Sequence, residues 1–392
     1  MMPSLLVLDR APASDRHILW GKKQVPEEHN RCLAVCVPTF QRPHLLRLLL
    51  RDLARQKLQP DLLIVVDGDP ASGEVRSLLN EVSPAAPWKF MYIPSNHANL
   101  PYQRYLGWRA SAGYRWLVYL DDDLRISQLT CLNKLVEPFQ LSDRNIAGVT
   151  ARIAFHSKRG SVSPTVGPSE TKTPFAGLIE RFGAGVHTPA GGLTPSGHRK
   201  LPLYGGQRYE NVDWLHGAVM AFRRRLLTAD CFSEDLFALA EVGCGLGEDT
   251  ILSRRAASKG QLLFAFCARV KHDKGEESKA RPTQEFRLGY ATALSRRLIN
   301  DNFRGLESPQ WPDRLALLKS YAGNILLAWP RALKGLEHRK VRYALGYTIG
   351  ALRGLCRGPS ARRLTPRVEW WLYAERAMIH AEELQTVRAR LA

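Results

Sequence analysis

Two groups of acidic side chains are the residues of this chain best suited to chemistry. Asp121, Asp122 and Asp123 directly follow the apolar run Trp116–Leu120. Three adjacent carboxylates suit a divalent cation, and hard oxygen ligands favour Mg²⁺ or Mn²⁺, which keeps coordination positions free for substrate phosphates. The second group, Glu248-Asp249, opens a helix-like segment and could supply a catalytic base. We therefore expect a metal site together with a proton acceptor.

The elements that must position these acids alternate along the first part of the chain. Apolar runs at residues 33–38, 62–67, 89–93 and 116–120 are typical of buried strands, and residues 44–58, 73–82 and 102–112 have helical spacing. This order predicts an α/β fold with a doubly wound, mostly parallel sheet. Ligands bind at the carboxyl ends of the strands in such sheets. Asp67 and the Asp121–Asp123 group both fall there.

The rest of the chain divides into three kinds of segment. Residues 156–210 are rich in Gly, Pro, Ser and Thr, and we interpret them as a mobile flap over the site. Order returns at residues 212–222, and a last strand at 262–266 closes at 270–272. Residues from 283 onward have helical spacing. We therefore predict an N-terminal extension (1–30), a catalytic domain (31–282) and a basic helical C-terminal extension (283–392).

The net charge of +19 indicates partners rather than fold. Residues 281–392 carry 20 Lys and Arg against 9 Asp and Glu, so the excess is concentrated there. Phosphates, nucleic acid and an anionic membrane are the candidate partners. The basic residues are dispersed and no nucleic-acid-binding motif is recognisable, which disfavours nucleic acid as the partner.

One C-terminal segment combines an apolar stripe with this basic charge. The stripe comprises Leu315, Leu318, Ala322, Ile325 and Trp329. Such a helix is suited to lie in a membrane interface. Packing onto the catalytic domain or onto a second subunit, as in a homodimer, is an equally good alternative.

Cysteine use and hydropathy bear on location. Seven cysteines without a Cys-x-x-Cys pair favour free thiols in a reducing compartment. The N-terminus lacks the pattern of a signal peptide, and no apolar stretch approaches the ~20 residues that cross a membrane. We expect a cytoplasmic protein that can rest peripherally on the inner face of the cell membrane.

The motifs, in this order, resemble family 2 glycosyltransferases of the GT-A fold. The similarity runs from about Ala34 to His272. It comprises Val-Pro-Thr-Phe-Gln-Arg at 37–42, Val-Val-Asp-Gly at 65–68, Gln-Arg-Tyr-Leu-Gly at 103–107, Leu-Asp-Asp-Asp at 120–123, Trp-Leu-His-Gly at 214–217, Gly-Glu-Asp-Thr at 247–250 and Val-Lys-His at 270–272. The Asp121–Asp123 group corresponds to the D-x-D motif of this family.

The resemblance implies an inverting, hexosyltransferase-type enzyme that uses a nucleotide-sugar donor. It suggests Mn²⁺ or Mg²⁺ at Asp121, Asp123 and His272, with Asp123 as direct ligand and Asp121 on ribose or a metal-bound water. It places donor binding at Pro38, Thr39, Phe40, Arg42, Asp67, Arg104, Asp121 and Asp122. Asp249 is the expected base and Glu248 its neighbour that orients acceptor or loop. Trp214 and Gly217 are expected on the acceptor side.

Two of these residues have structural alternatives. Arg104 could steady phosphate or Asp67, or form a structural ion pair. Trp214 could stack on a sugar or pack in the core. A helix cap is the corresponding alternative for Asp249.

Departures from the family pattern leave the donor and acceptor open. Gln41 replaces Asn, Tyr105 replaces Asn, and Gly68-Asp69-Pro70 replaces the commoner Asp-Gly-Ser. The nucleotide could be UDP, GDP or dTDP. The acceptor could be a glycan such as a cell-surface polysaccharide, a lipid-linked glycan or a small molecule. A non-catalytic scaffold and a basic nucleic-acid-binding protein are the alternative functions, and the intact Glu248-Asp249 pair argues against the scaffold.

Overall fold

The computed structural model describes most of the segment from residue 32 to residue 356. The described residues are 6–7, 32–95, 97–141, 145–156, 162–163, 189–232, 236–237, 240, 246–273, 285–305, 307–334 and 337–356. Except for β1 (Leu6–Val7), the predicted N-terminal extension lies outside them, as do residues 157–161 and 164–188 of the predicted flap and residues 357–392.

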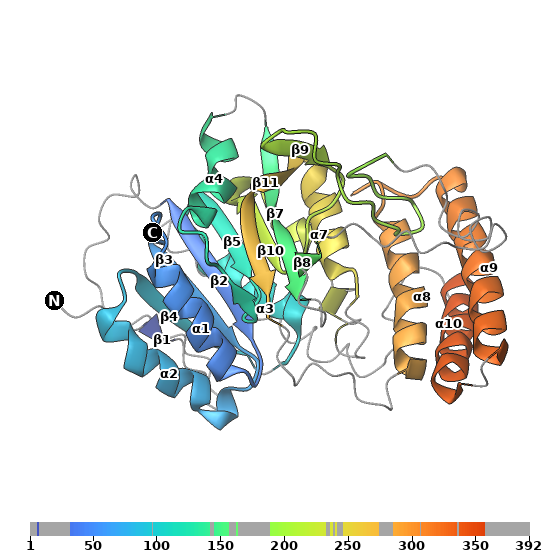
Figure 1. Ribbon diagram of the computed structural model, residues 1–392, viewed down its shortest axis with the longest axis horizontal. Helices are drawn as coiled ribbons and strands as arrows, with labels where there is room; N and C mark the ends of the chain where they lie inside the picture. The colour runs from blue at the N-terminus through green and yellow to red at the C-terminus, as the bar shows by residue number, and fades with distance from the viewer. Residues whose placement is uncertain are drawn as a thin grey trace, which may run out of the picture.

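The first half of the sheet is parallel, as predicted. Its order is β1, β4 (Lys89–Pro94), β3 (Leu62–Asp67), β2 (Leu33–Thr39) and β5 (Trp116–Leu120). Every residue of β2, β3 and β5 is buried, which explains why these strands are continuous apolar runs. The register sets Thr39 beside Asp67, so the ends of β2 and β3 reach the same edge (Figure 1).

Helices cover both faces of this sheet. Alternate residues of the strands pack with α1 (Pro43–Ala54), α2 (Glu74–Val82) and α4 (Cys131–Leu141) in one apolar core. The other strand face packs against α3 (Leu100–Ala110) and α7 (Glu248–Ala257). The period of two in a strand places successive side chains in these two cores. The fold is therefore the α/β, doubly wound class that the sequence predicts.

The second half of the sheet contains antiparallel pairs that the sequence did not indicate. β10 (Val219–Arg223) lies antiparallel between β5 and β7 (Ile146–His156), and β11 (Gln261–His272) runs parallel to β7. β6 (Leu124–Arg125) pairs antiparallel with the end of β11. The short strand β8 (Val162–Ser163) pairs antiparallel with β7, and β9 (Tyr209–Val212) pairs antiparallel with β11. The last strand is longer than predicted and carries His272 back to the end of β5.

The C-terminal helices form the predicted helical extension beside the sheet domain. They are α8 (Glu285–Asp301), α9 (Trp311–Lys334) and α10 (His338–Cys356) (Figure 1). Leu317 and Tyr321 of α9 are buried with Tyr347 of α10, whereas Leu315 and Leu318 are exposed. Thus α9 has an inward apolar face in addition to part of the predicted stripe. No helix within the described residues combines the length and the apolarity needed to cross a membrane.

Candidate active site

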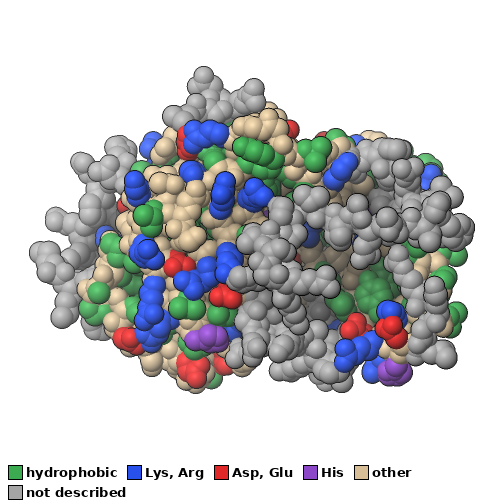
Figure 2. Space-filling model, in the orientation of Figure 1, with side chains coloured by type: hydrophobic (Ala, Val, Ile, Leu, Met, Phe, Trp, Pro, Cys, Tyr) green, Lys and Arg blue, Asp and Glu red, His purple; other side chains and the backbone are tan. Residues whose placement is uncertain are grey.

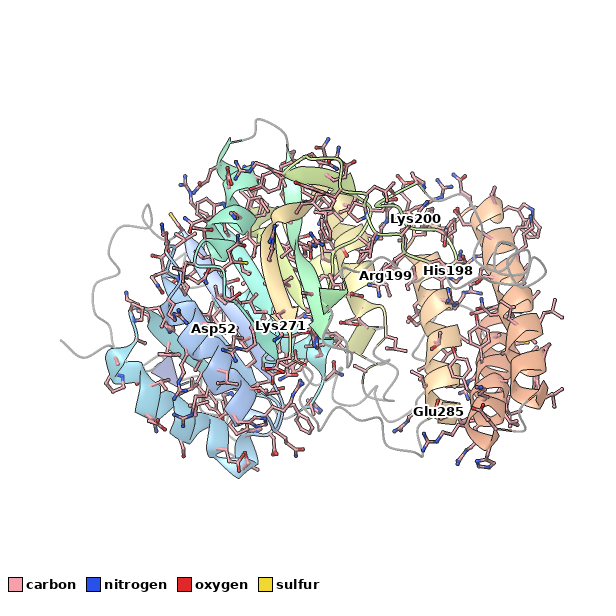
Figure 3. All side chains as sticks on the ribbon, in the orientation of Figure 1. Asp52, His198, Arg199, Lys200, Lys271 and Glu285 are labelled. Carbon is pink, nitrogen blue, oxygen red and sulfur yellow. The ribbon has the colours of Figure 1, made fainter. Side chains whose placement is uncertain are left out.

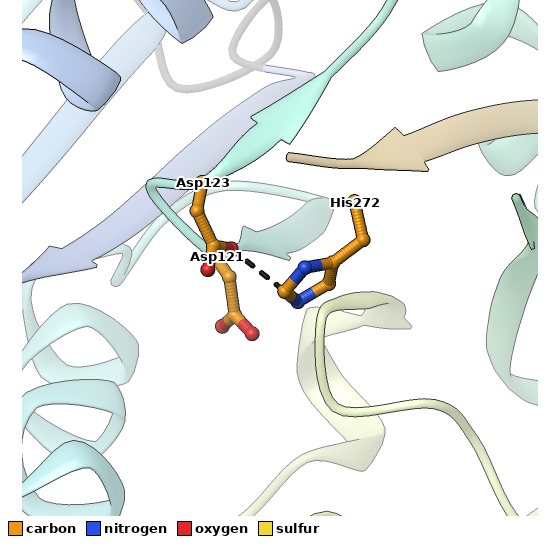
Figure 4. Close-up of side chains that lie close together, drawn as sticks. All are labelled: Asp121, Asp123 and His272. Atoms are coloured by element: carbon orange, nitrogen blue, oxygen red, sulfur yellow. Dashed lines mark ion pairs between the residues drawn. The ribbon is translucent and has the colours of Figure 1, made fainter. Parts of the chain in front are cut away.

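The predicted metal ligands Asp121, Asp123 and His272 come together in space. Their ligand atoms all lie within 4.8 Å of one another, and His272 Nε2 lies 3.5 Å from Asp123 Oδ1 (Figure 4). The pairing of β6 with β11 sets Leu124 opposite His272, and the Asp273 amide donates to the Asp123 carbonyl at 2.8 Å. Residues separated by about 150 positions thus meet at one corner of the sheet.

The three residues fit a divalent cation. Asp123 Oδ1 is buried and accepts no hydrogen bond from any residue that the structure describes. Burial raises the pKa of Asp121, against the attraction of Arg104, and the charge of Asp123 adds to the rise. A cation among these groups would compensate carboxylate charge that the protein partly leaves unneutralised, and two carboxylates with an imidazole are acceptable to Mn²⁺ or Mg²⁺.

Asp122 does not belong to this cluster. Its Oδ2 accepts from Thr39 Oγ1 at 2.7 Å, and its Oδ1 lies 2.9 Å from an Arg42 Nη2. Burial raises the pKa of Asp122 to about 7, although Arg42 opposes the rise. Arg42 also donates to Asp123 Oδ2 at 3.0 Å, so this predicted donor-binding residue bridges two carboxylates.

Asp67 lies at the predicted strand end with both oxygens engaged. Tyr92 Oη donates to Oδ2 and the Asp69 amide donates to Oδ1, each at 2.9 Å. Burial raises its pKa. Gln103, whose role the sequence did not indicate, donates from Nε2 to the carbonyls of Thr39 and Val66 and so ties the ends of β2 and β3 together. Pro38 and Thr39 are part of the same edge, and Phe40 next to them is 41% exposed.

One departure from the family pattern has a local cost. Gln41 has a φ of 55°, a left-handed conformation that Asn tolerates better than most residues. Its side chain donates to Asp69 Oδ2 at 2.8 Å. The family's Asn at this position therefore suits the backbone, and the contact with Asp69 helps to hold Gln41 there.

Arg104 connects the Asp121–Asp123–His272 cluster to the second acidic group. Its side chain is 1% exposed and donates to Glu248 Oε1 at 2.7 Å, to Asp121 Oδ1 at 3.2 Å and to the Gly217 carbonyl at 2.8 Å. None of its hydrogen bonds within the described part of the chain goes to Asp67. The ion pairs of Arg104 are thus with Glu248 and Asp121 and not with Asp67, while its contact with phosphate stays a prediction.

Glu248 and Asp249 begin α7 but are held differently. Burial and the neighbouring Asp249 raise the pKa of Glu248, while Arg104 opposes the rise. Burial likewise opposes ionisation of Asp249, but Arg199 and His216 lower its pKa overall. Gly247 is the N-cap residue of α7, and Asp249 in the first turn accepts from the Thr250 amide with Oδ1 at 2.7 Å, so Asp249 also satisfies an amide at the start of the helix.

Asp249 faces residues of the predicted acceptor side. Its Oδ2 accepts from the Gly217 amide at 3.0 Å and from Arg199 Nη1 at 2.8 Å. A Cβ at Gly217 would lie 3.0 Å from Asp249 Cβ, which explains glycine at this close approach. Trp214 is 5% exposed and packs in an apolar core, with the Arg199 guanidinium 4.9 Å from its ring centroid. Its packing agrees with the core alternative.

Arg199 is a site residue that sequence reasoning missed. It lies in the described end of the predicted flap, where Leu193 and Arg199 pair across a turn. The turn is tied to the C-terminal helices: Arg296 donates to the Ser196 carbonyl, and Asn300 donates to the Pro195 carbonyl. Figure 3 shows Arg199 on the side of α8 that faces the sheet and His198 toward α9, where its Nε2 lies 3.2 Å from Ser320 Oγ. A basic residue in a Gly-rich segment carries no pattern from which its partner could be predicted.

Comparison with known proteins supports the resemblance seen in the motifs. Residues 34–188 match the model of glycosyl transferase family 2, which confirms the predicted similarity to that family. A search of curated proteins found no significant match.

Solved structures are similar at low identity. GalNAc-T7 with UDP, GalNAc and Mn²⁺ has a TM-score of 0.43 and 15% identity, over 76% of this chain and 55% of that one. The match thus spans about half the length of GalNAc-T7. The mannosyltransferase PcManGT from Pyrobaculum calidifontis, in complex with GDP-Man and Mn²⁺, has a TM-score of 0.43 and 15% identity, over 85% and 89% of the two chains. S. aureus TarS 1–349 with UDP-GlcNAc has a TM-score of 0.41 and 12% identity, over 82% and 91%.

Proposed function

We propose, from the family 2 match and the site geometry, that this protein is an inverting glycosyltransferase of the GT-A type. It transfers a hexosyl group from a nucleotide-diphosphate donor to an acceptor hydroxyl. The observation that carries the proposal is the connection of two acidic centres: Arg104 contacts Asp121 of the metal cluster and Glu248 of the second acidic pair. The group proposed to hold the metal and the second acidic pair thus lie on either side of one buried guanidinium.

The donor side is the edge formed by the ends of β2, β3 and β5. In this proposal the nucleotide, which is UDP, GDP or dTDP, binds to Pro38, Thr39, Phe40, Arg42 and Asp67. Asp121, Asp123 and His272 would hold Mn²⁺ or Mg²⁺, which supplies Lewis-acid stabilisation of the departing diphosphate.

The acceptor side is centred on Asp249. In the proposed step the acceptor oxygen forms a bond to the anomeric carbon as the bond from that carbon to the diphosphate oxygen breaks. The hydroxyl proton passes to an Asp249 oxygen. Direct attack from the opposite face inverts the anomeric configuration and leaves no role for a covalent sugar–enzyme intermediate. Arg104 holds Glu248 beside this centre, where it orients the acceptor or the loop.

Arg199 must leave Asp249 before the proton is transferred. A carboxylate oxygen that accepts from a guanidinium and an amide at 2.8 and 3.0 Å has little affinity for a further proton. An acceptor hydroxyl that enters over Trp214 and Gly217 would take the place of the Arg199 side chain, which is 36% exposed.

The acceptor is proposed to be a glycan, as in a cell-surface polysaccharide, a lipid-linked glycan or a small molecule. We further propose a cytoplasmic location with peripheral contact to the inner face of the cell membrane. A homodimer through the same C-terminal helices is the competing proposal, and the experiment given below for the whole molecule separates the two.

Hydrolysis of nucleotide sugars without acceptor tests the proposal. A panel of UDP-, GDP- and dTDP-sugars with Mn²⁺ should reveal slow, chelator-sensitive release of nucleotide from the wild type. The Asp123→Ala variant should lose this release and most of the metal-dependent thermal stabilisation by donor, because it lacks the buried oxygen that faces His272.

Asp230→Asn is a matched control for this experiment. Asp230 forms an ion pair with Lys259 outside the metal cluster, so its variant should retain full metal dependence. Release of nucleotide that persists in excess chelator, or an Asp123→Ala variant of unchanged activity, would refute the metal assignment.

A further inference from the structure

Both ends of helix α1 contact the segment of residues 121–126, which contains two of the candidate metal ligands. Arg42, its N-cap residue, reaches Asp122 and Asp123. Asp52, near the other end of the same helix, contacts Arg125 and Ile126. The helix therefore spans the segment that begins with the carboxylates and continues into β6.

The Asp52 carboxylate is fully engaged by this segment. It accepts from Arg125 Nε at 2.8 Å, from Arg125 Nη2 at 3.2 Å and from the Ile126 amide at 2.9 Å. Asp52 is 5% exposed, so a carboxylate is buried at the base of α1 with bidentate and backbone partners. Charge-assisted, bidentate contacts of this kind define orientation as well as adding stability.

The segment that Asp52 holds lies directly beside His272, which β11 also holds through its ladder with β7. β6 has only two residues, and its ladder with β11 pairs Leu124 with His272 and Arg125 with Lys271. Asp123 immediately precedes β6, and its carbonyl accepts from the Asp273 amide. Figure 3 labels Asp52 on α1 and Lys271 at the end of β11, and Arg125 connects the two, since it donates to Asp52 and pairs with Lys271. A displacement of β6 would therefore separate Asp123 from His272.

We propose that Asp52 is a positioning residue of the metal site, which acts through Arg125 and Ile126 to keep β6 in register with β11. It does not touch the candidate ligands. Asp52 instead keeps Asp123, which precedes β6, close to His272, which β6 pairs with on β11. The proposal rests on the proposed function, because it requires that the Asp121–Asp123–His272 cluster binds a divalent ion.

Mn²⁺ binding to the full-length protein, measured by electron paramagnetic resonance without nucleotide, tests this role. Asp52→Asn and Arg125→Gln should each weaken Mn²⁺ binding, by about 10- to 100-fold as for other outer-shell partners of metal ligands. The two changes act on one contact, so the double variant should lose little more than either single variant.

The direction of the Arg125→Gln effect separates positioning from simple electrostatics. Removing a positive charge near the cluster would strengthen Mn²⁺ binding by Coulomb attraction, whereas loss of positioning weakens it. Arg125→Lys, which keeps the charge and loses the bidentate geometry, should also weaken binding and is the milder variant if Asp52→Asn fails to fold.

Asp313→Asn controls for general loss of stability. Asp313 is 3% exposed and pairs with Arg304 among the C-terminal helices, so its variant should lower Tm and leave Mn²⁺ affinity unchanged. A wild type that binds no Mn²⁺ would refute the metal site and the inference together. A wild type that binds Mn²⁺ while Arg125→Gln and Arg125→Lys retain its affinity would refute the inference alone.

Discussion

Two arginines give the adjacent carboxyl groups of Glu248 and Asp249 opposite properties. Burial raises the pKa of Glu248 despite Arg104, and Arg199 with His216 lowers that of Asp249 despite burial. Neighbouring carboxyl groups whose pKa values are driven apart are typical of acid–base sites. Because Asp249 is ionised and its counter-ion is partly exposed, it remains our choice of base.

Asp249→Asn should lower kcat by about 10²- to 10⁴-fold, the usual contribution of general-base catalysis. Asparagine can still accept the hydrogen bond of the Gly217 amide, so donor affinity should change little. Steady-state kinetics with an identified acceptor, together with donor binding by calorimetry, measure both quantities. A near-normal kcat, or a product that retains the donor's anomeric configuration, would contradict the assigned role.

His216 should make the protein less stable in mild acid. Burial lowers its pKa to about 4, against an ordinary value of 6.5. The unfolded chain therefore binds a proton between these values that the folded protein does not. Stability should fall as pH drops from about 6.5 to about 4, by as much as about 3 kcal/mol from this residue.

His216→Gln should remove that part of the pH dependence, because glutamine does not titrate. Urea unfolding gives the free energy of unfolding of wild type and variant at pH 7 and at pH 5. The contribution of His216 is the loss of stability between these pH values in the wild type minus the loss in the variant. Equal losses of stability in the two proteins would show that His216 does not remain neutral in the fold.

At the scale of elements, close helix packing explains how the C-terminal extension is built. α8 and α10 approach so closely that a Cβ at Gly346 would overlap the carbonyl oxygen of Phe286. Tyr321 and Tyr347 pack edge to face in the small core that α8, α9 and α10 share. This bundle also holds the turn that carries Arg199, through Asn300 and Arg296. The helices therefore support the acceptor side as well as themselves.

Gly346→Ala should destabilise this bundle by about 1–3 kcal/mol or more, since the backbone of α8 must move to admit a methyl group. Thermal unfolding of the full-length protein, followed by circular dichroism, gives the change in Tm. Leu345→Ala is the matched control, because Leu345 on the same helix is 42% exposed. An unchanged Tm for Gly346→Ala would mean that α8 and α10 are not so closely packed.

At the scale of the whole molecule, exposed apolar side chains and basic charge occur together on the C-terminal helices. Leu326 and Leu333 of α9 and Leu352 of α10 are 59%, 58% and 55% exposed. Arg339, Lys340 and Arg342 begin α10. Figure 2 shows further Lys and Arg side chains gathered over the sheet domain, and hydrophobic side chains along the edge where Figure 1 places α9. This arrangement supports the proposed contact with anionic lipid.

Flotation with liposomes tests this contact. The protein should bind vesicles that contain phosphatidylserine and not neutral vesicles, and salt should weaken binding, since each basic residue near the surface contributes about 1 kcal/mol. The double variant Leu326→Ser/Leu333→Ser should bind less, because it lacks two exposed apolar side chains of α9.

Leu203→Ser is the control, since Leu203 is 72% exposed outside the C-terminal helices. Equal binding to neutral and anionic vesicles would contradict the proposal. A wild type that is dimeric by light scattering and becomes monomeric in the double variant would favour the homodimer instead.

Elements with a local pattern could be predicted from the amino-acid sequence. Residues 33–38, 62–67 and 116–120 are buried along their whole length, so their apolar runs predicted the strands and the sheet edge where Asp67 and Asp121–Asp123 lie. The third predicted ligand, His272, followed from the order of family motifs. None of these predictions required a contact between distant residues to be known.

Which distant residues meet could be learned only from the three-dimensional fold. The antiparallel insertion of β10, the two-residue pairing of β6 with β11 and the partners of Arg104 and Arg199 leave no periodic pattern in the sequence. A charged side chain far from its counter-ion along the chain carries no information about that partner. The pairing arises only when the hydrophobic core brings the elements together and burial makes an unpaired charge costly. For that reason the sequence indicated the carboxylates of the site, and the fold decided their counter-ions.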